Sequence, residues 1–111
     1  MAQVLFLAEA LRREWRVAVP FAEQAGWDAV IQCGDQWRSV QVKTAYKREG
    51  RSSYCVDTMK GGGYGNKRTT ASRKYRGDEF DLLAAVDVVT GRVWLLPMSE
   101  VAGRRSVALP K

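Results

Sequence analysis

Asp28, Gln41 and Lys43 are the residues of this sequence best suited to chemistry. A carboxylate and an amide oxygen are hard donors of the kind that Mg²⁺ prefers, and the backbone carbonyl of Val42 could add a third oxygen. A lysine beside such an ion could position or deprotonate a water and stabilise charge on a phosphate. The alternative is that Gln41 and Lys43 form the ordinary polar side of a strand and that Asp28 is exposed.

A hairpin must bring these residues together. Residues 27–33 (WDAVIQC) and 37–45 (WRSVQVKTA) are β-rich, and the Gly34-Asp35 pair between them predicts a tight turn. In that register Asp28 lies directly across from Gln41. Because side chains alternate along a strand and cross-strand partners share a face, Asp28, Gln41 and Lys43 should project from one face. The opposite face becomes the expected core side, formed by Trp27, Ala29, Ile31, Val40 and Val42.

The rest of the chain predicts a helix followed by further strands. Residues 2–15 have helical spacing, with one apolar face made of Val4, Leu7, Ala8, Leu11 and Trp15. Residues 16–20 predict a short strand and 21–26 a loop. We expect a strand at 54–57, a loop from the glycine cluster 61–65 to residue 76, and a strand within 80–89 paired with 93–96 across Thr90-Gly91. The segment 99–111 carries no clear signal.

Positive charge is concentrated in one segment. Eleven Lys and Arg residues lie between positions 38 and 76 against two acidic ones, which gives this segment a net charge of +9, whereas the whole chain carries +6. Because phosphate contacts dominate nucleic-acid affinity, this segment suits a polyanion, although an ordinary solvated surface is the alternative. The candidate DNA contacts are Arg38, Lys47, Arg48, Arg51, Lys60, Lys67, Arg68, Arg73, Lys74 and Arg76. Trp37 and Tyr46 flank the basic strand and could stack on bases or pack within the hairpin.

Size and composition favour one compact domain over residues 1–111. The sequence contains no apolar run near the roughly 20 residues needed to cross a bilayer and no secretory leader, so we expect a soluble, cytoplasmic protein with no membrane partner. Cys33 and Cys55 are the only cysteines, and the absence of histidine argues against a zinc site. We interpret the two thiols as incidental.

Several motifs resemble one known family. Residues 39–45 (SVQVKTA), with the upstream Val19-Pro20 and the run 27–30 (WDAV), look like the PD-(D/E)XK nuclease superfamily. The similarity is greatest to its small group I intron-associated endonucleases and archaeal Holliday-junction resolvases. Residues 75–81 (YRGDEFD) and 92–97 (RVWLLP) also look like the intron-type group, so the resemblance covers nearly the whole chain.

The resemblance implies an α/β, single-domain, restriction-endonuclease-like fold with the N-terminal helix packed on a mixed central β-sheet. It implies an endonuclease that cuts duplex or branched DNA with Mg²⁺ or Mn²⁺, in the manner of a Holliday-junction resolvase or a related enzyme. Asp28, Gln41 and Lys43 would be the catalytic residues, and the metal ligands would be Asp28, Gln41, the Val42 carbonyl and Gln3. Since each chain has one site, two-strand cleavage implies a homodimer or higher homo-oligomer.

The sequence departs from the family pattern at three places. Trp27 stands where the family has proline, and Gln41 replaces the usual acidic residue, as it does in the intron-type group. The helix position that carries a glutamate in the family aligns with Gln3, and the alternative Glu9 is expected on the solvent side of the helix. Asp78, Glu79 and Asp81 could supplement the site or simply begin the next element.

These departures leave two alternatives to the nuclease open. One is a catalytically weak or inactive nuclease-fold protein that binds DNA. The other is a structural or regulatory protein whose basic loop meets an acidic partner.

Overall fold

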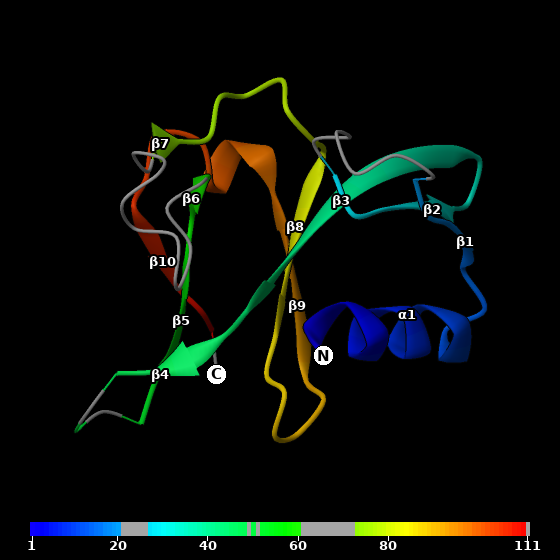
Figure 1. Cartoon of the computed structure of the whole chain (residues 1–111). Helices are drawn as coiled ribbons and strands as arrows, with labels where there is room; N and C mark the ends of the chain where they lie inside the picture. Colours follow the sequence, from blue (N-terminus) through cyan, green and yellow to red (C-terminus); the bar gives the residue numbers. More distant parts are fainter. Residues whose placement is uncertain (21–26, 49, 51, 61–72, 111) are drawn as a thin grey trace.

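The computed structural model of the chain describes residues 1–20, 27–48, 50, 52–60 and 73–110. Its centre is a five-stranded sheet in the order β1-β2-β3-β8-β9, in which β3 and β8 run parallel and all other neighbours antiparallel (Figure 1). The helix α1 (Ala2–Arg12) lies on one face of this mixed sheet, as predicted. The strands are β1 (Arg16–Ala18), β2 (Ala29–Cys33), β3 (Gln36–Thr44), β8 (Leu82–Val86) and β9 (Val93–Pro97).

The hairpin of β2 and β3 has the predicted register. Cys33 pairs with Gln36 and Ala29 with Val40, and the turn between the strands is Gly34-Asp35. Gly34 has a φ of 66°, a left-handed conformation that glycine adopts without steric cost. A turn of two residues fixes the register of the hairpin, and the register decides which side chains of β2 and β3 share a face.

A second layer covers the other face of the sheet. It contains the three-stranded sheet β10-β5-β4 and the two-stranded pair of β6 and β7. The predicted strand 54–57 is confirmed as β5, whereas Arg73–Lys74 forms the short strand β7 inside the predicted loop. These elements are β4 (Tyr46–Lys47), β5 (Tyr54–Asp57), β6 (Met59–Lys60), β7 (Arg73–Lys74), the 3-10 helix η1 (Met98–Glu100) and β10 (Ser106–Ala108).

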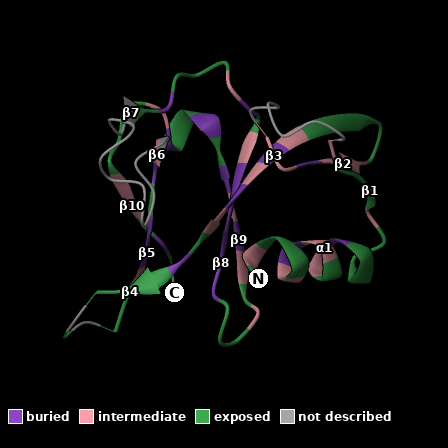
Figure 2. Cartoon of the chain, in the orientation of Figure 1, coloured by how far each residue is buried: buried purple, intermediate pink, exposed green. Residues whose placement is uncertain are grey.

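The middle of the sheet is buried on both faces, whereas β1 and the start of β3 are largely exposed (Figure 2). Strand β8 has the sequence LLAAV, and such an apolar run is typical of a strand covered on both sides. One cluster lies between the sheet and α1 and contains Phe6, Ala29, Ile31, Val40, Val42, Ala84 and Val86. The other lies between the sheet and the second layer and includes Val56, Tyr75, Phe80, Leu83, Ala85, Trp94 and Leu96.

Trp27 is a correction to the expected core side. Its ring packs against the cluster under the second layer and not against the cluster under α1. Strand β2 begins only at Ala29, and the backbone N–H of Asp28 donates to the carbonyl of Val40 at 2.8 Å. The pairing therefore shifts by one residue at Asp28, and the alternation of side chains does not extend back to Trp27.

The helix buries a different face from the predicted one and ends at Arg12 rather than Trp15. Phe6 and Ala10 are fully buried, whereas Val4 and Leu11 are 64% and 66% exposed. The helix is apolar almost all round, so helical spacing alone does not select the docking face, and the largest side chain, Phe6, faces the sheet. No helix in the described ranges is long and apolar enough to cross a bilayer.

Candidate active site

Asp28 is held between the helix and the central strand. Its Oδ2 accepts a hydrogen bond from the backbone N–H of Val42 at 2.8 Å, and its Oδ1 accepts one from Nε2 of Gln3 at 2.9 Å. The residue is half-buried. Because of the shift in pairing at Asp28, its carboxylate reaches the backbone one residue beyond Gln41. The structure thus brings Asp28, Gln3 and the Gln41-Val42 segment together.

These residues form a set of oxygen donors. Gln41 is half-buried and lies on the sheet face of its parallel neighbour Leu83, and the N–H of Val42 points to Asp28. In an extended strand the N–H and C=O of one residue project toward the same edge, so the Val42 carbonyl also lies on the Asp28 side. Each carboxylate oxygen of Asp28 keeps a second lone pair beyond its hydrogen bond. One carboxylate with neutral oxygens suits a hard ion that retains several waters, such as Mg²⁺.

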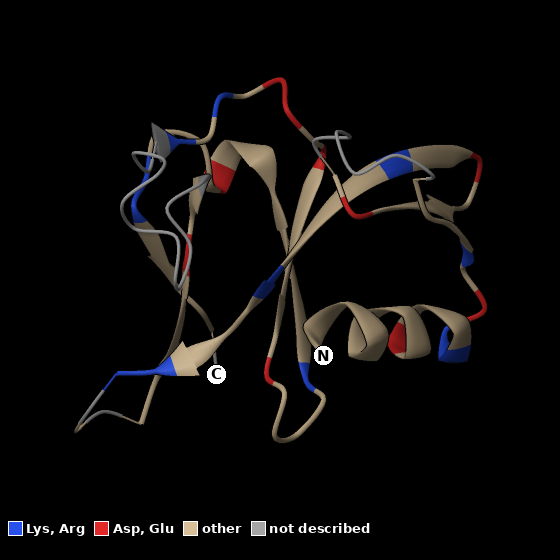
Figure 3. Cartoon of the chain, viewed as in Figure 1, with Lys and Arg blue, Asp and Glu red and all other residues tan. Residues whose placement is uncertain are grey.

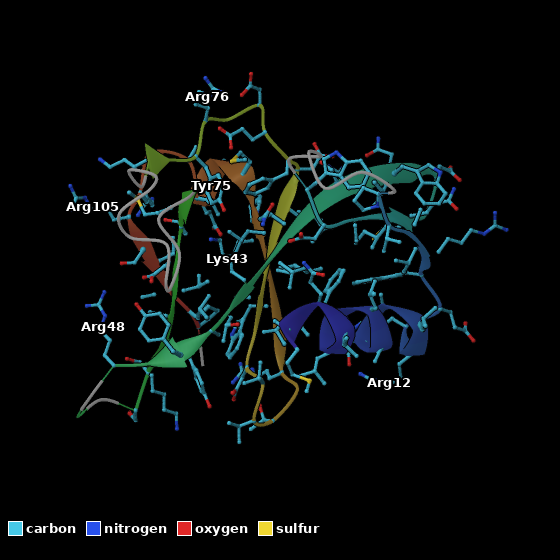
Figure 4. The ribbon with its side chains drawn as sticks, viewed as in Figure 1. Arg12, Lys43, Arg48, Tyr75, Arg76 and Arg105 are labelled. Atoms are coloured by element: carbon cyan, nitrogen blue, oxygen red, sulfur yellow. The ribbon has the colours of Figure 1, made fainter. Side chains whose placement is uncertain are left out.

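Lys43 projects from the same face of β3 as Gln41 and points into the second layer (Figure 4). Its Nζ donates to the carbonyl of Met59 at 3.0 Å and lies 5.7 Å from the centre of the Tyr75 ring. Burial lowers the pKa of Lys43, and the negative charges of Asp57 and Asp28 oppose that shift. The amine is therefore a partly desolvated cation held between the Met59 carbonyl and the Tyr75 ring.

Glu9 is not a member of this site. Its carboxylate accepts hydrogen bonds from Arg12 at 2.6 Å and Arg13 at 2.7 Å, and these bonds lower its pKa to about 2. The expected position on the solvent side is also wrong, because the Glu9 side chain is only 17% exposed and lines a small cavity with Val93 and Leu95. The helix residue that meets Asp28 is Gln3.

The acidic residues before β8 have other partners. Asp81 accepts a hydrogen bond from the backbone N–H of Ser39 at 2.8 Å, and Glu79 pairs with Arg76 at 3.3 Å. In the part of the chain that the structure describes, no three His, Cys, Asp or Glu side chains are grouped so that they could hold a metal. Asp28 is thus the carboxylate around which the donor set is built. Cys33 and Cys55 are both free.

Several of the predicted basic residues lie on or beside the second layer (Figure 3). Lys47 lies over the ring of Tyr54 at 5.0 Å, and Arg48 donates to Ser106 at 3.2 Å. Arg105 lies outside the basic segment 38–76 and was not predicted as a contact. It joins this layer because it directly precedes β10, which pairs with β5. A basic pair at positions 104–105, directly before a β-rich triplet, was the only signal for it. Outside the described residues lie Arg51, Lys67, Arg68, the glycine cluster 61–65 and the loop 21–26, as do the side chains of Lys60 and Arg73.

Arg38 is a predicted DNA contact, but it does not lie on the face of β3 from which Lys43 projects. It lies five positions before Lys43 on β3, so the two side chains lie on opposite faces, and Arg38 donates to Gln36 at 2.6 Å. Trp37 and Tyr46 are 49% and 38% exposed, so neither is packed in the core. Trp37 shares the face of Gln41 and Lys43.

Comparison with known proteins gives two findings. Residues 1–109 match the family model described as PD-(D/E)XK endonuclease. Among solved structures, the chain is similar to a bacterial homing endonuclease, I-Ssp6803I, with a TM-score of 0.79 and 24% sequence identity, over 99% of this chain and 74% of that one. This structural likeness shows a common fold. None of the curated proteins matches the chain.

Proposed function

This chain belongs to the PD-(D/E)XK endonuclease family, and from that premise we propose that it is a metal-dependent DNA endonuclease. One observation carries the proposal. The Asp28 carboxylate is fixed beside the Gln41-Val42 backbone by hydrogen bonds from Val42 and Gln3, while Lys43 extends from the same strand. The chemistry that such a set supports is hydrolysis of a phosphodiester.

Asp28, the Gln41 amide oxygen and the Val42 carbonyl would hold Mg²⁺ or Mn²⁺, with Gln3 at the edge of the site. When bound, such an ion polarises a phosphate oxygen and lowers the pKa of a bound water. Asp28 supplies the one full negative charge, since Gln41 and Gln3 are neutral. Weaker metal binding than at a site with two or three carboxylates is the expected consequence.

Lys43 acts on the phosphate and the attacking water in this proposal. As an ammonium, its Nζ donates a hydrogen bond to a phosphate oxygen and stabilises the charge that develops there. The lowered pKa of Lys43 also makes its neutral form more accessible than that of a solvated lysine, so the same Nζ can accept a proton from water. Both roles require the amine within hydrogen-bond reach of the reacting atoms.

DNA, duplex or branched, is the substrate that the charge distribution supports. The basic residues of the second layer, Lys47, Arg48, Lys74, Arg76 and Arg105, lie on the side of the sheet that Lys43 faces. Phosphate contacts from such a layer give affinity without sequence reading. The similar I-Ssp6803I structure is that of a homing endonuclease, which supports DNA as the polymer. A homodimer would supply the second site that two-strand cleavage or junction resolution needs.

A second candidate function is DNA binding without cleavage. The observation that favours it is the donor set itself, which has one carboxylate and the neutral Gln3 where the family has glutamate. This candidate predicts salt-sensitive DNA binding that Mg²⁺ and substitution of Lys43 leave unchanged.

Incubation with supercoiled plasmid and with a four-way junction, in Mg²⁺, Mn²⁺ or EDTA, tests the proposal. We expect metal-dependent cutting that Lys43→Ala slows by about 10²- to 10⁴-fold, because that variant loses the proton-transfer and charge-stabilising group. Thr44→Ala is the matched control, since Thr44 is the next residue of β3, is exposed and lies on the opposite face. A gel-shift assay of both variants separates loss of cutting from loss of binding.

The plasmid products also report on assembly. A homodimer predicts linear product, whereas a monomer with one site leaves nicked circles. Cutting by Lys43→Ala at the wild-type rate would contradict the site assignment. Binding with no metal-dependent cutting of either substrate would favour the binding-only candidate.

A further inference from the structure

Lys43 meets the second layer at two fixed points. Its Nζ donates to the Met59 carbonyl at 3.0 Å and lies 5.7 Å from the centre of the Tyr75 ring, within the range of a cation–π contact (Figure 4). Both partners come from one unit, since Met59 in β6 pairs with Lys74 in β7 and Tyr75 follows β7 directly. The half-buried amine is thus held by a strand pair that belongs to neither β3 nor its neighbours in the central sheet.

The Tyr75 ring is itself fixed. It is 4% exposed and meets Phe80 edge to face, with ring centres 4.9 Å apart. Its carbonyl accepts a hydrogen bond from Gly103 at 3.1 Å. A ring packed in this way presents one face in a constant direction, because close packing leaves it no room to turn.

We propose that Tyr75, together with the Met59 carbonyl, is a positioning residue that holds the Lys43 amine at the candidate active site. Lysine has a flexible four-carbon stem and its ammonium has three N–H groups. One donates to Met59, and the ring lies beside the cation, so the other two remain for the reacting groups. Reactive groups must be held to within about 0.5 Å of their working position, and β3 alone does not restrict the long stem of Lys43 that far.

This inference rests on the nuclease function proposed above, and it extends the site to a residue that touches neither DNA nor metal. In this proposal the second layer covers the sheet and also holds the Lys43 amine in place for the reaction. A substitution that removes the ring should leave Asp28 and Gln41 in place, because they contact α1 and the central strands. Only the placement of the Lys43 amine should change.

Three variants separate positioning from core packing. Tyr75→Leu removes the aromatic ring, whereas Tyr75→Phe keeps it. Trp94→Leu is the core control, because it removes a buried aromatic ring of the same cluster that packs against Tyr54. Thermal unfolding of all three shows how much folded protein each assay contains.

We expect Tyr75→Leu to lower kcat by about ten- to a hundredfold with KM for DNA unchanged, since a displacement near 1 Å can cost that much in rate. Tyr75→Phe should lose much less kcat than Tyr75→Leu because the ring remains, and Trp94→Leu should stay within about twofold of the wild-type kcat in its folded fraction. Wild-type kcat in Tyr75→Leu, or an equal loss in Trp94→Leu, would overturn the proposal.

A spectroscopic measurement decides the question even when no DNA is cut. In protein with ¹³C-labelled lysine, the Lys43 side chain should be rigid by relaxation, with cross-peaks to the Tyr75 ring, in the wild type and in Trp94→Leu. In Tyr75→Leu it should be as mobile as a solvated lysine. A mobile wild-type Lys43 contradicts the positioning role, whereas a rigid Lys43 in a protein that cuts no DNA contradicts only the nuclease function.

Discussion

Asp28 links the helix α1 to the central strand β3 through three hydrogen bonds. Its backbone N–H donates to Val40, its Oδ2 accepts from Val42, and its Oδ1 accepts from Gln3 of the helix. Both donors to the carboxylate, the Val42 backbone N–H and the Gln3 amide, are neutral, so they orient the carboxylate without neutralising it. The charge available to a cation therefore stays at one, and the attraction of the donor set for Mg²⁺ rests on Asp28.

The identity of Gln3 should limit metal affinity, and Gln3→Glu tests this. The variant places a second carboxylate within hydrogen-bond reach of Asp28, where Gln3 now donates at 2.9 Å. Without metal the two like charges repel, so the melting temperature should fall below that of the wild type. With Mg²⁺ or Mn²⁺ the order should reverse, and metal affinity by calorimetry should rise about tenfold, or roughly 1.4 kcal/mol.

The control for this prediction is Gln36→Glu, the same change at an exposed position of the hairpin. It should alter neither metal affinity nor the effect of metal on melting. If Gln3→Glu bound metal no better than the wild type, then position 3 would not face the metal, and the role of Gln3 would be confined to orienting Asp28.

At the scale of elements, the predictable features are the local ones. A two-residue turn set the register of β2 and β3 from Ala29 to Cys33, whereas the shift in pairing that places Asp28 against Val40 did not follow from Gly34-Asp35. The docking face of α1 did not follow, because a helix that is apolar almost all round gives its spacing pattern no contrast. Strands of two or three residues such as β4, β6 and β7 are too short to show alternation.

The candidate site likewise has a part that local sequence patterns predict and a part that they do not. The strand residues could be found from the sequence, whereas the hydrogen bond between Gln3 and Asp28 and the contacts of Lys43 with Met59 and Tyr75 depend on how layers pack. These contacts join residues 25, 16 and 32 positions apart in the sequence, so no local pattern indicates them. These contacts arise from tertiary packing and cannot be predicted from the spacing of residues along the chain.

The connection between β8 and β9 depends on Asp87. This side chain is 4% exposed and accepts hydrogen bonds from Tyr54 and Thr90, both at 2.7 Å, and from the N–H of Val89 at 3.1 Å. Asp87→Asn replaces an acceptor by a donor in this cluster and should lower the free energy of unfolding by about 1–3 kcal/mol. Urea unfolding at pH 7 measures the change, with the exposed turn variant Asp35→Asn as the control.

The same residue should contribute to acid sensitivity. The hydrogen bond from Tyr54, supported by those from Thr90 and Val89, lowers the pKa of Asp87 against the opposing effect of burial. A depressed folded-state pKa stabilises the protein above the unfolded value of about 3.9, and that contribution is lost as pH falls through the folded pKa. Between pH 7 and pH 2 the wild type should therefore lose more stability than Asp87→Asn. Parallel curves for the two proteins would show that Asp87 titrates alike in the folded and unfolded chain.

On the scale of the whole molecule, charge and layers coincide. The helix covers one face of the central sheet, and the second layer, which carries a group of basic side chains, covers the other (Figures 1 and 3). Lys43 points from β3 into that basic layer and not toward α1. A polyanion that contacts the second layer would therefore lie on the side of the sheet from which the catalytic candidates Gln41 and Lys43 project.

This arrangement predicts which arginines set the salt dependence of DNA binding. Arg76, whose side chain is 73% exposed, and the exposed Arg105 both project from the second layer (Figure 4). If each contacts one phosphate, replacing both by alanine should weaken binding to every DNA sequence alike. It should also reduce the slope of log affinity against log salt by about 0.9 per contact, or roughly 1.8 in total.

Arg16→Ala is the matched control, because Arg16 is exposed on β1 at the far edge of the sheet. Fluorescence anisotropy with a labelled duplex between about 50 and 200 mM salt measures all three proteins. The Arg16→Ala slope should equal that of the wild type. A steeper loss in Arg16→Ala than in the Arg76→Ala, Arg105→Ala double variant would mean that DNA lies across the β1 edge, and the proposed approach to Lys43 from the second layer would then be wrong.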